Sequence, residues 1–448
     1  MINKIDEKFL KDLKEYISFK SISTDEAYLG EIEKTVFWLK SYIENAGGKV
    51  ELLQKGKSNP VVLGNFFVEE KLPTVLLYGH YDVQPAAKED GWTTGDPFIL
   101  EQKNLGKKDR LVARGVVDNK GQNFIHLYTI CKLFQKGKLR YNVKTFIEGG
   151  EECGSPDLDL ILKTYGKSHL QADYLLVSDG EIVKDNPVLE SSLRGVGNMK
   201  VTLTTGKNNL HSGLFGGAVP SATDEMSKLI SSFKDGRNRV LVKDFYKGVT
   251  LPNKEVLKNN KNLGTEKEAT KTAGVKKLLT IKNYDFYTQT GCLPSLEISG
   301  VKGGYIGEGF SNIVPASSEC RINVRVVPKQ KTQDVMRLIQ NHVKKVVPKY
   351  VEVKVEMEGH GDSIKLDSGC EFAKEVRKIL EKSYRKKVLD KYLGGSIPVL
   401  GDFQKLLKIK VVSASLGNND CNMHGVDENF RVDLVEKGLS FAENFWAK

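Results

Sequence analysis

The sequence predicts an α/β protein with a mainly parallel sheet and flanking helices, interrupted by a second, smaller α+β domain. Three observations support this fold class. Apolar strand-like runs alternate with helical stretches up to about residue 190, which is typical of a parallel sheet. Strands with alternating apolar and polar residues then dominate up to about residue 362. The first pattern returns afterwards, so we expect the middle part to be an insertion.

The chain has 448 residues, which is more than one ordinary hydrophobic core requires. We therefore expect two domains. The first is formed by residues 1–192 together with 363–448, and the inserted domain covers 193–362.

The first domain begins with an amphipathic segment in which Ile5, Leu10, Leu13 and Ile17 recur at helical spacing. Further helices are expected at 119–138 and 370–386. The strand-like runs are VLLYGHYD (75–82), RGVVDNKG (114–121), VKTFIEGGEE (143–152), ADYLLVSDG (172–180) and VVSASLGNNDCNMHG (411–425).

The inserted domain combines alternating strands with two helical segments. This composition predicts a small sandwich of the ferredoxin-like kind, in which the helices cover one sheet. The expected strands are 198–206, 295–304, 318–329 and 350–359, and the expected helices are 221–235 and 332–347.

The composition excludes several classes of protein. Hydrophobic residues make up 40% and charged residues 28%, which is typical of a folded protein and not of a disordered one. No segment approaches the roughly 20 apolar residues of a membrane helix, so we expect no membrane partner. The net charge of +11 comes from lysines interleaved with acids, and the densest stretch, 247–277, has few aromatic residues for base stacking. We therefore expect no nucleic-acid partner.

The N-terminus suits a surface helix better than a signal peptide, and the six cysteines form no CxxC pair. We expect reduced thiols and a cytoplasmic location.

Polar side chains with metal-binding chemistry follow the strand-like runs of the first domain. In an open α/β sheet, the carboxyl ends of the strands meet at one edge, so these side chains are expected to converge. Histidine and carboxylate without cysteine suit a pair of divalent ions, Zn²⁺ or Mn²⁺ with Co²⁺ as a further candidate. The candidates are His80, Asp82, Asp118, Glu151, Glu152, Asp179 and His424.

The spacing of these residues suggests different roles. Asp118, between the two sequence clusters, is the best candidate to bridge two ions. Asp82 lies two residues from His80 and either binds an ion or orients the imidazole, and we favour the second role. Of Glu151 and Glu152, which point to different sides, one is expected to bind an ion and the other to act as a general base. Taken singly, each residue also fits a hydrogen-bonded pair, a helix cap or solvated charge.

Taken together, these motifs resemble a known family, the co-catalytic zinc metallopeptidases that include carnosinase, cytosolic nonspecific dipeptidase, aminoacylase and acetylornithine deacetylase. The resemblance runs nearly end to end, and HYDVQP and GGSIP resemble the dipeptidase branch. The motifs are GHYDVQP (79–85), GWTTGDPF (91–98), RGVVDNKGQ (114–122), EGGEECGS (148–155), LRG (193–195), HSG (211–213), SNIVP (311–315), RVVP (325–328), GGSIPV (394–399) and HGVDE (424–428).

The resemblance implies a role for each residue. His80 and Asp179 would hold one ion, Glu152 and His424 the other, and Asp118 would bridge them. The peptide bond from Asp118 to Asn119 would be cis. Asp82 would orient the imidazole and Glu151 would be the general base. The remaining implied residues are His211, which would reach the partner's active site in a homodimer formed by the inserted lid domain, and the substrate-binding residues Asn312, Arg325, Gly395 and Ser396.

The implied activity is hydrolysis of dipeptides with a free C-terminal carboxylate by a zinc-exopeptidase-like catalytic domain. An N-acyl amino acid deacylase would use the same site, and its substrates carry the same carboxylate. A silent binding protein that kept the fold, and a nucleic-acid binder, are the alternatives from other classes. Cys153 departs from the family pattern, and the sequence assigns it no role.

Overall fold

The computed structural model describes residues 5–106, 108–394 and 398–448. Contacts between residues divide the chain into two compact units. Unit 1 comprises Met1–Ser191, Leu366–Asp390 and Val399–Lys448, and unit 2 comprises Ser192–Lys365 and Lys391–Pro398. The sequence-based limits assign the last of these segments to the larger domain instead.

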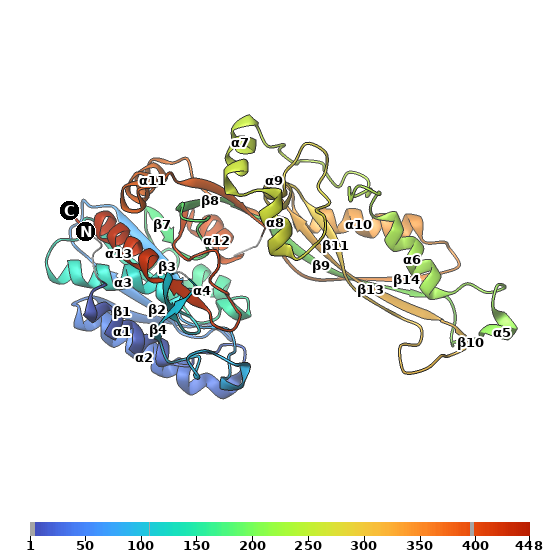
Figure 1. Ribbon diagram of the computed structural model, residues 1–448, viewed down its shortest axis with the longest axis horizontal. Coiled ribbons are helices and arrows are strands. Elements are labelled where there is room, and N and C mark those ends of the chain that lie inside the picture. Colours follow the sequence, from blue (N-terminus) through green and yellow to red (C-terminus); the bar gives the residue numbers. More distant parts are fainter. Residues whose placement is uncertain (1–4, 107, 395–397) are drawn as a thin grey trace. The chain divides into compact units, whose positions relative to one another are not determined.

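A single sheet forms the centre of unit 1 (Figure 1). Its strands follow the order β1-β2-β6-β3-β7-β17-β8. The four strands β6, β3, β7 and β17 run parallel, and β1, β2 and β8 pair antiparallel on either side. The mainly parallel sheet is therefore confirmed. The bounds are β1 Lys49–Leu53, β2 Val61–Phe66, β3 Thr74–His80, β6 Asn142–Glu148, β7 Tyr174–Val177, β8 Val188–Leu193 and β17 Lys410–Ser415.

Helices cover this sheet because the central strands are apolar on both faces. α2 contacts β1 and β2, α3 contacts β3, α11 contacts β17, and α13 packs on α3 and α11. The helices and short helical turns are α1 Glu7–Ser18, η1 Glu26–Tyr28, α2 Leu29–Asn45, η2 Lys88–Asp90, α3 Lys120–Gln135, η3 Glu151–Cys153, α4 Leu158–Tyr165, α11 Glu371–Tyr384, α12 Pro398–Asp402, η4 Phe403–Leu407 and α13 Val432–Trp446.

The run 114–121 was predicted as a strand, and this prediction is wrong. β5 (Lys108–Val112) ends before it and pairs with β4 (Glu101–Leu105) and β18 (Asn429–Arg431) in a separate three-stranded sheet. Gly115 adopts a positive φ of 80°, and the backbone N–H groups of Gly115, Val117 and Asp118 donate to the carboxylate of Glu428 instead of a neighbouring strand. Asp118 therefore comes from a loop that leads directly into α3.

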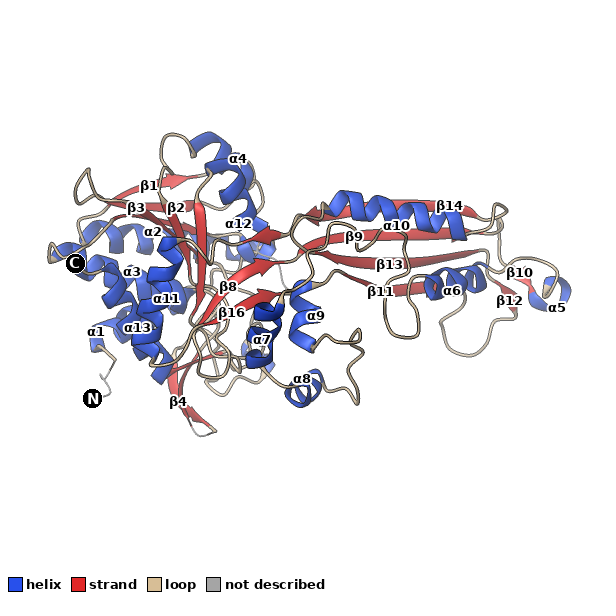
Figure 2. Cartoon of the chain, turned by 90° about the horizontal axis from the view of Figure 1, so that it is seen from above, coloured by secondary structure: helices blue, strands red, loops and turns tan. Residues whose placement is uncertain are grey.

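Unit 2 contains a four-stranded antiparallel sheet in the order β11-β13-β9-β14 (Figure 2). Along the chain the order is β9-α6-β11-β13-α10-β14, which is the ferredoxin-like arrangement that the sequence predicts. Helices α6 and α10 contact each other and the sheet, and they bury one apolar core. The bounds are β9 Gly195–Thr204, α6 Ala222–Ser232, β11 Ser295–Gly303, β13 Ser317–Val326, α10 Thr332–Val346 and β14 Glu352–Gly361.

Smaller elements complete the fold, and the sequence predicts none of them. Three helices lie in the lysine-rich stretch and its continuation, and a two-stranded sheet is formed by β10 and β12. These elements are β10 Leu210–His211, α5 Ser212–Phe215, α7 Lys254–Leu263, α8 Glu266–Ala273, α9 Phe286–Cys292, β12 Ile313–Val314, β15 Ile364–Lys365 and β16 Leu389–Leu393. Within the described ranges, no helix combines the length and apolar character needed to span a membrane.

Candidate metal centre

Strand β3 delivers His80 to the carboxyl edge of the central sheet of unit 1. The strand is buried almost throughout and pairs in parallel with β6 and β7, so the chain leaves it at the same edge as its neighbours. The imidazole of His80 is fully buried. Its Nδ1 atom lies 3.0 Å from the backbone oxygen of Asp82 and 3.3 Å from Asp82 Oδ1, and its Nε2 atom therefore faces the site.

The carboxylate of Asp82 is itself held on several sides. Oδ2 accepts hydrogen bonds from Ser23 Oγ at 2.6 Å and from the backbone N–H of Glu152 at 3.0 Å. Oδ1 accepts from the backbone N–H of Glu151 at 3.3 Å. Asp82 thus links the imidazole of His80 to the turn η3, which supports the orienting role predicted for it.

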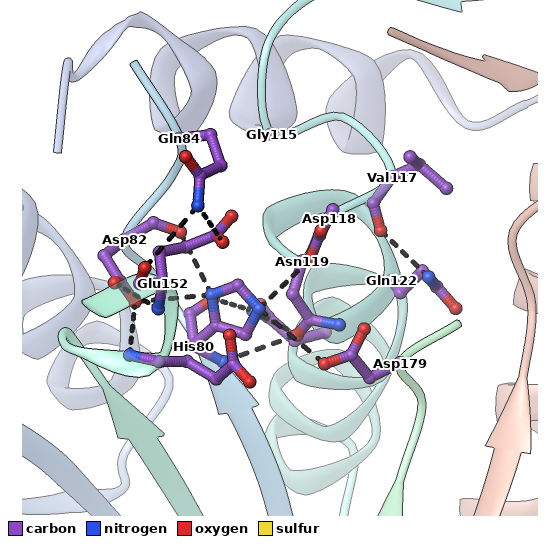
Figure 3. Close-up of polar contacts among 12 residues, drawn as sticks. His80, Asp82, Gln84, Gly115, Val117, Asp118, Asn119, Gln122, Glu152 and Asp179 are labelled. Atoms are coloured by element: carbon purple, nitrogen blue, oxygen red, sulfur yellow. Dashed lines mark hydrogen bonds and ion pairs between the residues drawn. The ribbon is translucent and has the colours of Figure 1, made fainter. Parts of the chain in front are cut away.

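Asp118 lies between two imidazoles. Oδ1 is 3.1 Å from His80 Nε2, and Oδ2 is 2.8 Å from His424 Nε2 (Figure 3 shows the His80 side). Burial by itself would raise the pKa of Asp118, but the hydrogen bonds to His424 and His80 hold it well below its ordinary value. The bond from Asp118 to Asn119 is cis, as the family resemblance implies.

The loop that carries Asp118 is fixed by a buried ion pair that the sequence did not single out. Arg114 Nη1 lies 2.6 Å from Glu428 Oε2, and both side chains are almost completely buried. Glu428 also accepts from the backbone N–H groups of Gly115, Val117 and Asp118. Because Arg114 donates further to the backbone oxygen of His424, the ion pair connects the two loops that supply these ligand candidates.

The neighbours Glu151 and Glu152 occupy different surroundings. Glu152 Oε2 lies 3.4 Å from His424 Nε2 and accepts a hydrogen bond from Gln84, whereas its Oε1 atom is buried without a partner. In the part of the chain that the structure describes, no hydrogen bond reaches the carboxylate of Glu151. Burial, together with the charges of Asp118 and Glu152, raises the pKa of Glu151 to about 7 against the opposing effect of His80.

These side chains form two groups that share Asp118. One consists of His80, Asp118 and Asp179, and the other of Asp118, Glu152 and His424; within each, the candidate ligand atoms lie within 4.8 Å of one another. Asp179 Oδ2 is 3.7 Å from His80 Nε2, and burial and the nearby charge of Asp118 raise the pKa of Asp179 well above its ordinary value. Carboxylates buried this close together repel one another, so a bound positive charge would stabilise them.

The donor set fits divalent cations. Imidazole nitrogen and carboxylate oxygen are the ligands expected for Zn²⁺ or Mn²⁺, and the shared carboxylate suits two neighbouring ions. A bound ion would also neutralise the carboxylates that burial now destabilises, and it would satisfy the buried Oε1 atom of Glu152.

The predicted residues of unit 2 lie in two separate places. His211 and Ile313 face each other in the β10–β12 pair, and Asn312 accepts from the backbone N–H of Ser212, so His211 and Asn312 are close. Arg325 lies near the far end of β13, eight residues beyond Ser317, which corresponds to roughly 26 Å along a strand. Figure 2 shows β10 and β12 at one end of the four-stranded sheet.

Two further predicted residues, Gly395 and Ser396, lie outside the described residues. The residue just before them, Gly394, accepts a hydrogen bond from Arg194 through its backbone oxygen. Arg325 is half-buried, and burial lowers its pKa.

Sequence reasoning missed the residues that hold the ligand candidates in place. Glu428 and Gln84 belong to the motifs HGVDE and HYDVQP, so these motifs contained a signal for them. Nothing in the sequence pattern indicates that Ser23 donates to Asp82, because the two residues are 59 positions apart.

Comparisons with known proteins find similar chains. The family model described as "Peptidase family M20/M25/M40" matches residues 76–448. The Cys-Gly metallodipeptidase DUG1 of Candida albicans is 28% identical over 464 residues, covering 98% of this chain and 93% of the relative. The human Beta-Ala-His dipeptidase is 25% identical, covering 98% and 90%.

A solved structure, the M20 family metallo-carboxypeptidase Sso-CP2 from Sulfolobus solfataricus, superposes with a TM-score of 0.83. It is 28% identical in sequence, and the match covers 98% of both chains.

Proposed function

Because the chain belongs to peptidase family M20/M25/M40, we propose that it is a metal-dependent dipeptidase acting on dipeptides with a free C-terminal carboxylate. The observation that carries the proposal is the pair of ligand groups sharing Asp118, beside which Glu151 has a carboxylate that belongs to neither group. Relatives named as dipeptidases cover nearly the whole chain, which favours dipeptides over N-acyl amino acids.

We propose that His80 and Asp179 hold one divalent ion, Glu152 and His424 hold the other, and Asp118 belongs to both. The distances among these side chains support this assignment. When bound, such ions polarise the scissile carbonyl and make water a nucleophile at neutral pH. Zn²⁺ and Mn²⁺ are the proposed ions, and Co²⁺ is a further candidate because these ligand types accept several metals.

Glu151 is the proposed general base. Its carboxylate would take a proton from the attacking water and then deliver it to the leaving amine. Asp82 would hold the imidazole of His80 in one orientation.

Arg325, a half-buried guanidinium, would bind the substrate carboxylate with two parallel hydrogen bonds, and Gly395 and Ser396 are proposed to line the same pocket.

We propose a homodimer formed through unit 2, in which His211 reaches the partner's active site to polarise the substrate carbonyl. The separation within one chain supports this proposal, because roughly 26 Å between the His211 end of the sheet and Arg325 is too far for one dipeptide to contact both. Asn312 lies beside His211, so it would act on the partner's substrate as well. A solution mass of twice that of the chain, measured by light scattering, is expected; a fully active monomer would contradict the proposal.

A cytoplasmic location stays a prediction. All six cysteines are free, which fits a reducing compartment. A fluorescent fusion or cell fractionation would check it.

The decisive assay compares Cys-Gly, β-Ala-His and other unblocked dipeptides with matched N-acetyl amino acids. Metal-free protein is supplied in turn with Zn²⁺, Mn²⁺ and Co²⁺. Hydrolysis of the dipeptides alone is expected. Hydrolysis of the acetyl compounds alone would replace the dipeptidase by a deacylase, and inactivity together with absence of bound metal would favour a binding protein.

A further inference from the structure

Gln84 contacts a proposed metal ligand, and the proposed hydrolysis assigns it no step. It lies four residues beyond His80, and its Nε2 atom donates to Glu152 Oε2 at 2.8 Å (Figure 3). The same amide lies 3.5 Å from the backbone oxygen of Glu152, so it contacts both the side chain and the turn that carries it. Gln84 is partly buried, and the side chain of Glu152 is 3% exposed.

The hydrogen bond fixes the direction of the carboxylate. The oxygen that accepts from Gln84 is also the one that lies 3.4 Å from His424 Nε2, whereas the other oxygen is buried without a partner. A freely rotating glutamate would lose conformational entropy on binding an ion, and a fixed one has lost it already. Because the amide is neutral, it holds the carboxylate without cancelling the negative charge that attracts a cation. A lysine or arginine in its place would cancel that charge.

The two ligand groups differ in how firmly their other members are held. His80 is fully buried, and Asp82 holds its Nδ1 atom. The side chain of His424 is half exposed, and among the described residues no hydrogen bond reaches its Nδ1 atom. The group of Asp118, Glu152 and His424 therefore depends more on the support that Glu152 receives.

We propose that Gln84 is a positioning residue for the divalent ion held by Asp118, Glu152 and His424. Retention of that ion depends on the Gln84 amide, and retention of the ion beside His80 does not. The inference rests on the proposed metal-dependent function and adds to it an inequality between the two ion positions. Substitution of a residue that orients a metal ligand typically lowers metal affinity by about 10- to 100-fold.

The test counts bound ions and does not depend on hydrolysis. Wild-type and Gln84→Met proteins are loaded with Zn²⁺, dialysed against a graded series of chelator buffers, and analysed for zinc per chain. Methionine keeps the length of the side chain and removes the donor. The variant is expected to lose one ion at a free Zn²⁺ concentration about 10- to 100-fold higher than wild type does. The second ion should be lost at an unchanged concentration.

Two controls make the outcome specific. Gln102→Met removes an exposed amide that donates to Asp109 at 3.4 Å, and its two zinc losses should match wild type. His424→Ala should fail to bind the ion that Gln84→Met loses early, so the corresponding loss of zinc should be missing from its measurement. If that loss is still seen in His424→Ala, the assignment to that ion is wrong. The metal-free variant should unfold at the wild-type temperature.

If Gln84→Met weakened the binding of both ions equally, or of neither ion, the inference would be overturned and the proposed dipeptidase would remain. A wild-type chain that retains no divalent ion would instead overturn the proposed function itself.

Discussion

Glu151 and Glu152 are adjacent in sequence but occupy different electrostatic environments. Glu152 is held by Gln84 and faces His424, as expected of a ligand. No hydrogen bond from the described residues reaches the carboxylate of Glu151, and burial raises its pKa to about 7, as suits a group that exchanges protons at neutral pH. The proposed division of roles therefore follows from their surroundings.

Glu151→Gln tests this division directly. Removing the general base while keeping the shape should lower kcat by about 10²- to 10⁴-fold and leave both ions bound. Steady-state kinetics with a dipeptide and metal analysis of the same sample measure the two quantities. Glu152→Gln is the matched comparison and should lose an ion. Near-normal turnover in Glu151→Gln would show that another residue takes the proton.

His126 is a buried histidine outside the site, and it should make stability depend on pH. Its Nδ1 atom accepts from Trp446 Nε1 at 3.0 Å, so its proton lies on Nε2, which is 2.9 Å from Ser178 Oγ. Burial lowers its pKa to about 3. The unfolded chain, with an ordinary histidine pKa of about 6.5, binds this proton first, so stability is lost as the pH falls below about 6.5.

His126→Gln removes this titration. Between pH 7.5 and 5.0, wild type should lose about 2 kcal/mol of unfolding free energy more than the variant, which keeps a donor and an acceptor but binds no proton. Urea unfolding of the metal-free proteins at both pH values measures the difference. Identical pH dependence would mean that His126 is protonated in the folded protein.

The start of helix α3 holds the loops that carry three of the ligand candidates. Its first turn follows Asp118 directly, and the buried amides in and just before this turn bind backbone oxygens near three ligand candidates. Asn123 donates to the backbone of His80, Asn119 to that of Ser178, and Gln122 to those of Val117 and Gly180. Lys120 binds the backbone oxygens of Tyr16 and Phe19 at the end of α1. This helix start therefore fixes the spacing of His80, Asp118 and Asp179.

Gly121 allows the chain to turn into this helix. A Cβ atom added there would lie 1.8 Å from the backbone oxygen of Val116, too close to be relieved by side-chain movement. Gly121→Ala should lower the unfolding free energy by about 3 kcal/mol or more. Gly30, also the second residue of its helix, has nothing within 4 Å, and Gly30→Ala should leave stability unchanged or raise it by up to about 1 kcal/mol. Urea unfolding compares them; equal effects would contradict the steric argument.

Among the described residues, two large apolar cores lie in different units. One is formed by residues of unit 1 and the other by residues of unit 2, and both groups of metal-ligand candidates belong to unit 1. Binding of metal should therefore stabilise one unit and not the other.

Calorimetry of the metal-free and zinc-loaded proteins should show two transitions, of which only the unit 1 transition rises with zinc. The stabilisation reaches about 4 kcal/mol when free zinc exceeds its dissociation constant a thousandfold. Ile322→Ala, which opens a cavity in the unit 2 core, identifies the other transition by lowering it. A single transition that moves as a whole would show that the two units unfold together.

A mixed dimer of two differently substituted, inactive chains can test whether His211 acts across the dimer. His211→Ala and Glu151→Gln chains, each nearly inactive alone, are co-expressed with different tags and purified through both. The mixed dimer should regain activity, because one of its sites combines an intact Glu151 with the partner's intact histidine. Glu151→Gln paired with Asp82→Asn should stay inactive, since every site then contains one defect. Without recovery in the first pair, His211 does not act on the partner.

The order of residues alone was enough to predict the class of fold and the identity of the ligand candidates. The alternation of apolar runs is set by which faces are buried, so it predicted the parallel sheet and the ferredoxin-like unit. Side chains that follow parallel strands must meet at one edge, so the strand pattern was enough to group His80 with Asp179. The remaining ligand candidates were identified by the motifs that resemble the family.

The groups that hold those residues in position become evident in the folded chain and not before. Ser23, Gln84 and Glu428 act through hydrogen bonds with residues far away along the chain, and such contacts leave no periodic pattern in the sequence. The loop before Asp118 shows the same limit. Its apolar residues resemble a strand, but the buried carboxylate of Glu428, supplied from 310 residues away, accepts its N–H groups in place of a neighbouring strand. Local propensity is a short-range property, and the competition for buried hydrogen bonds is settled by the whole fold.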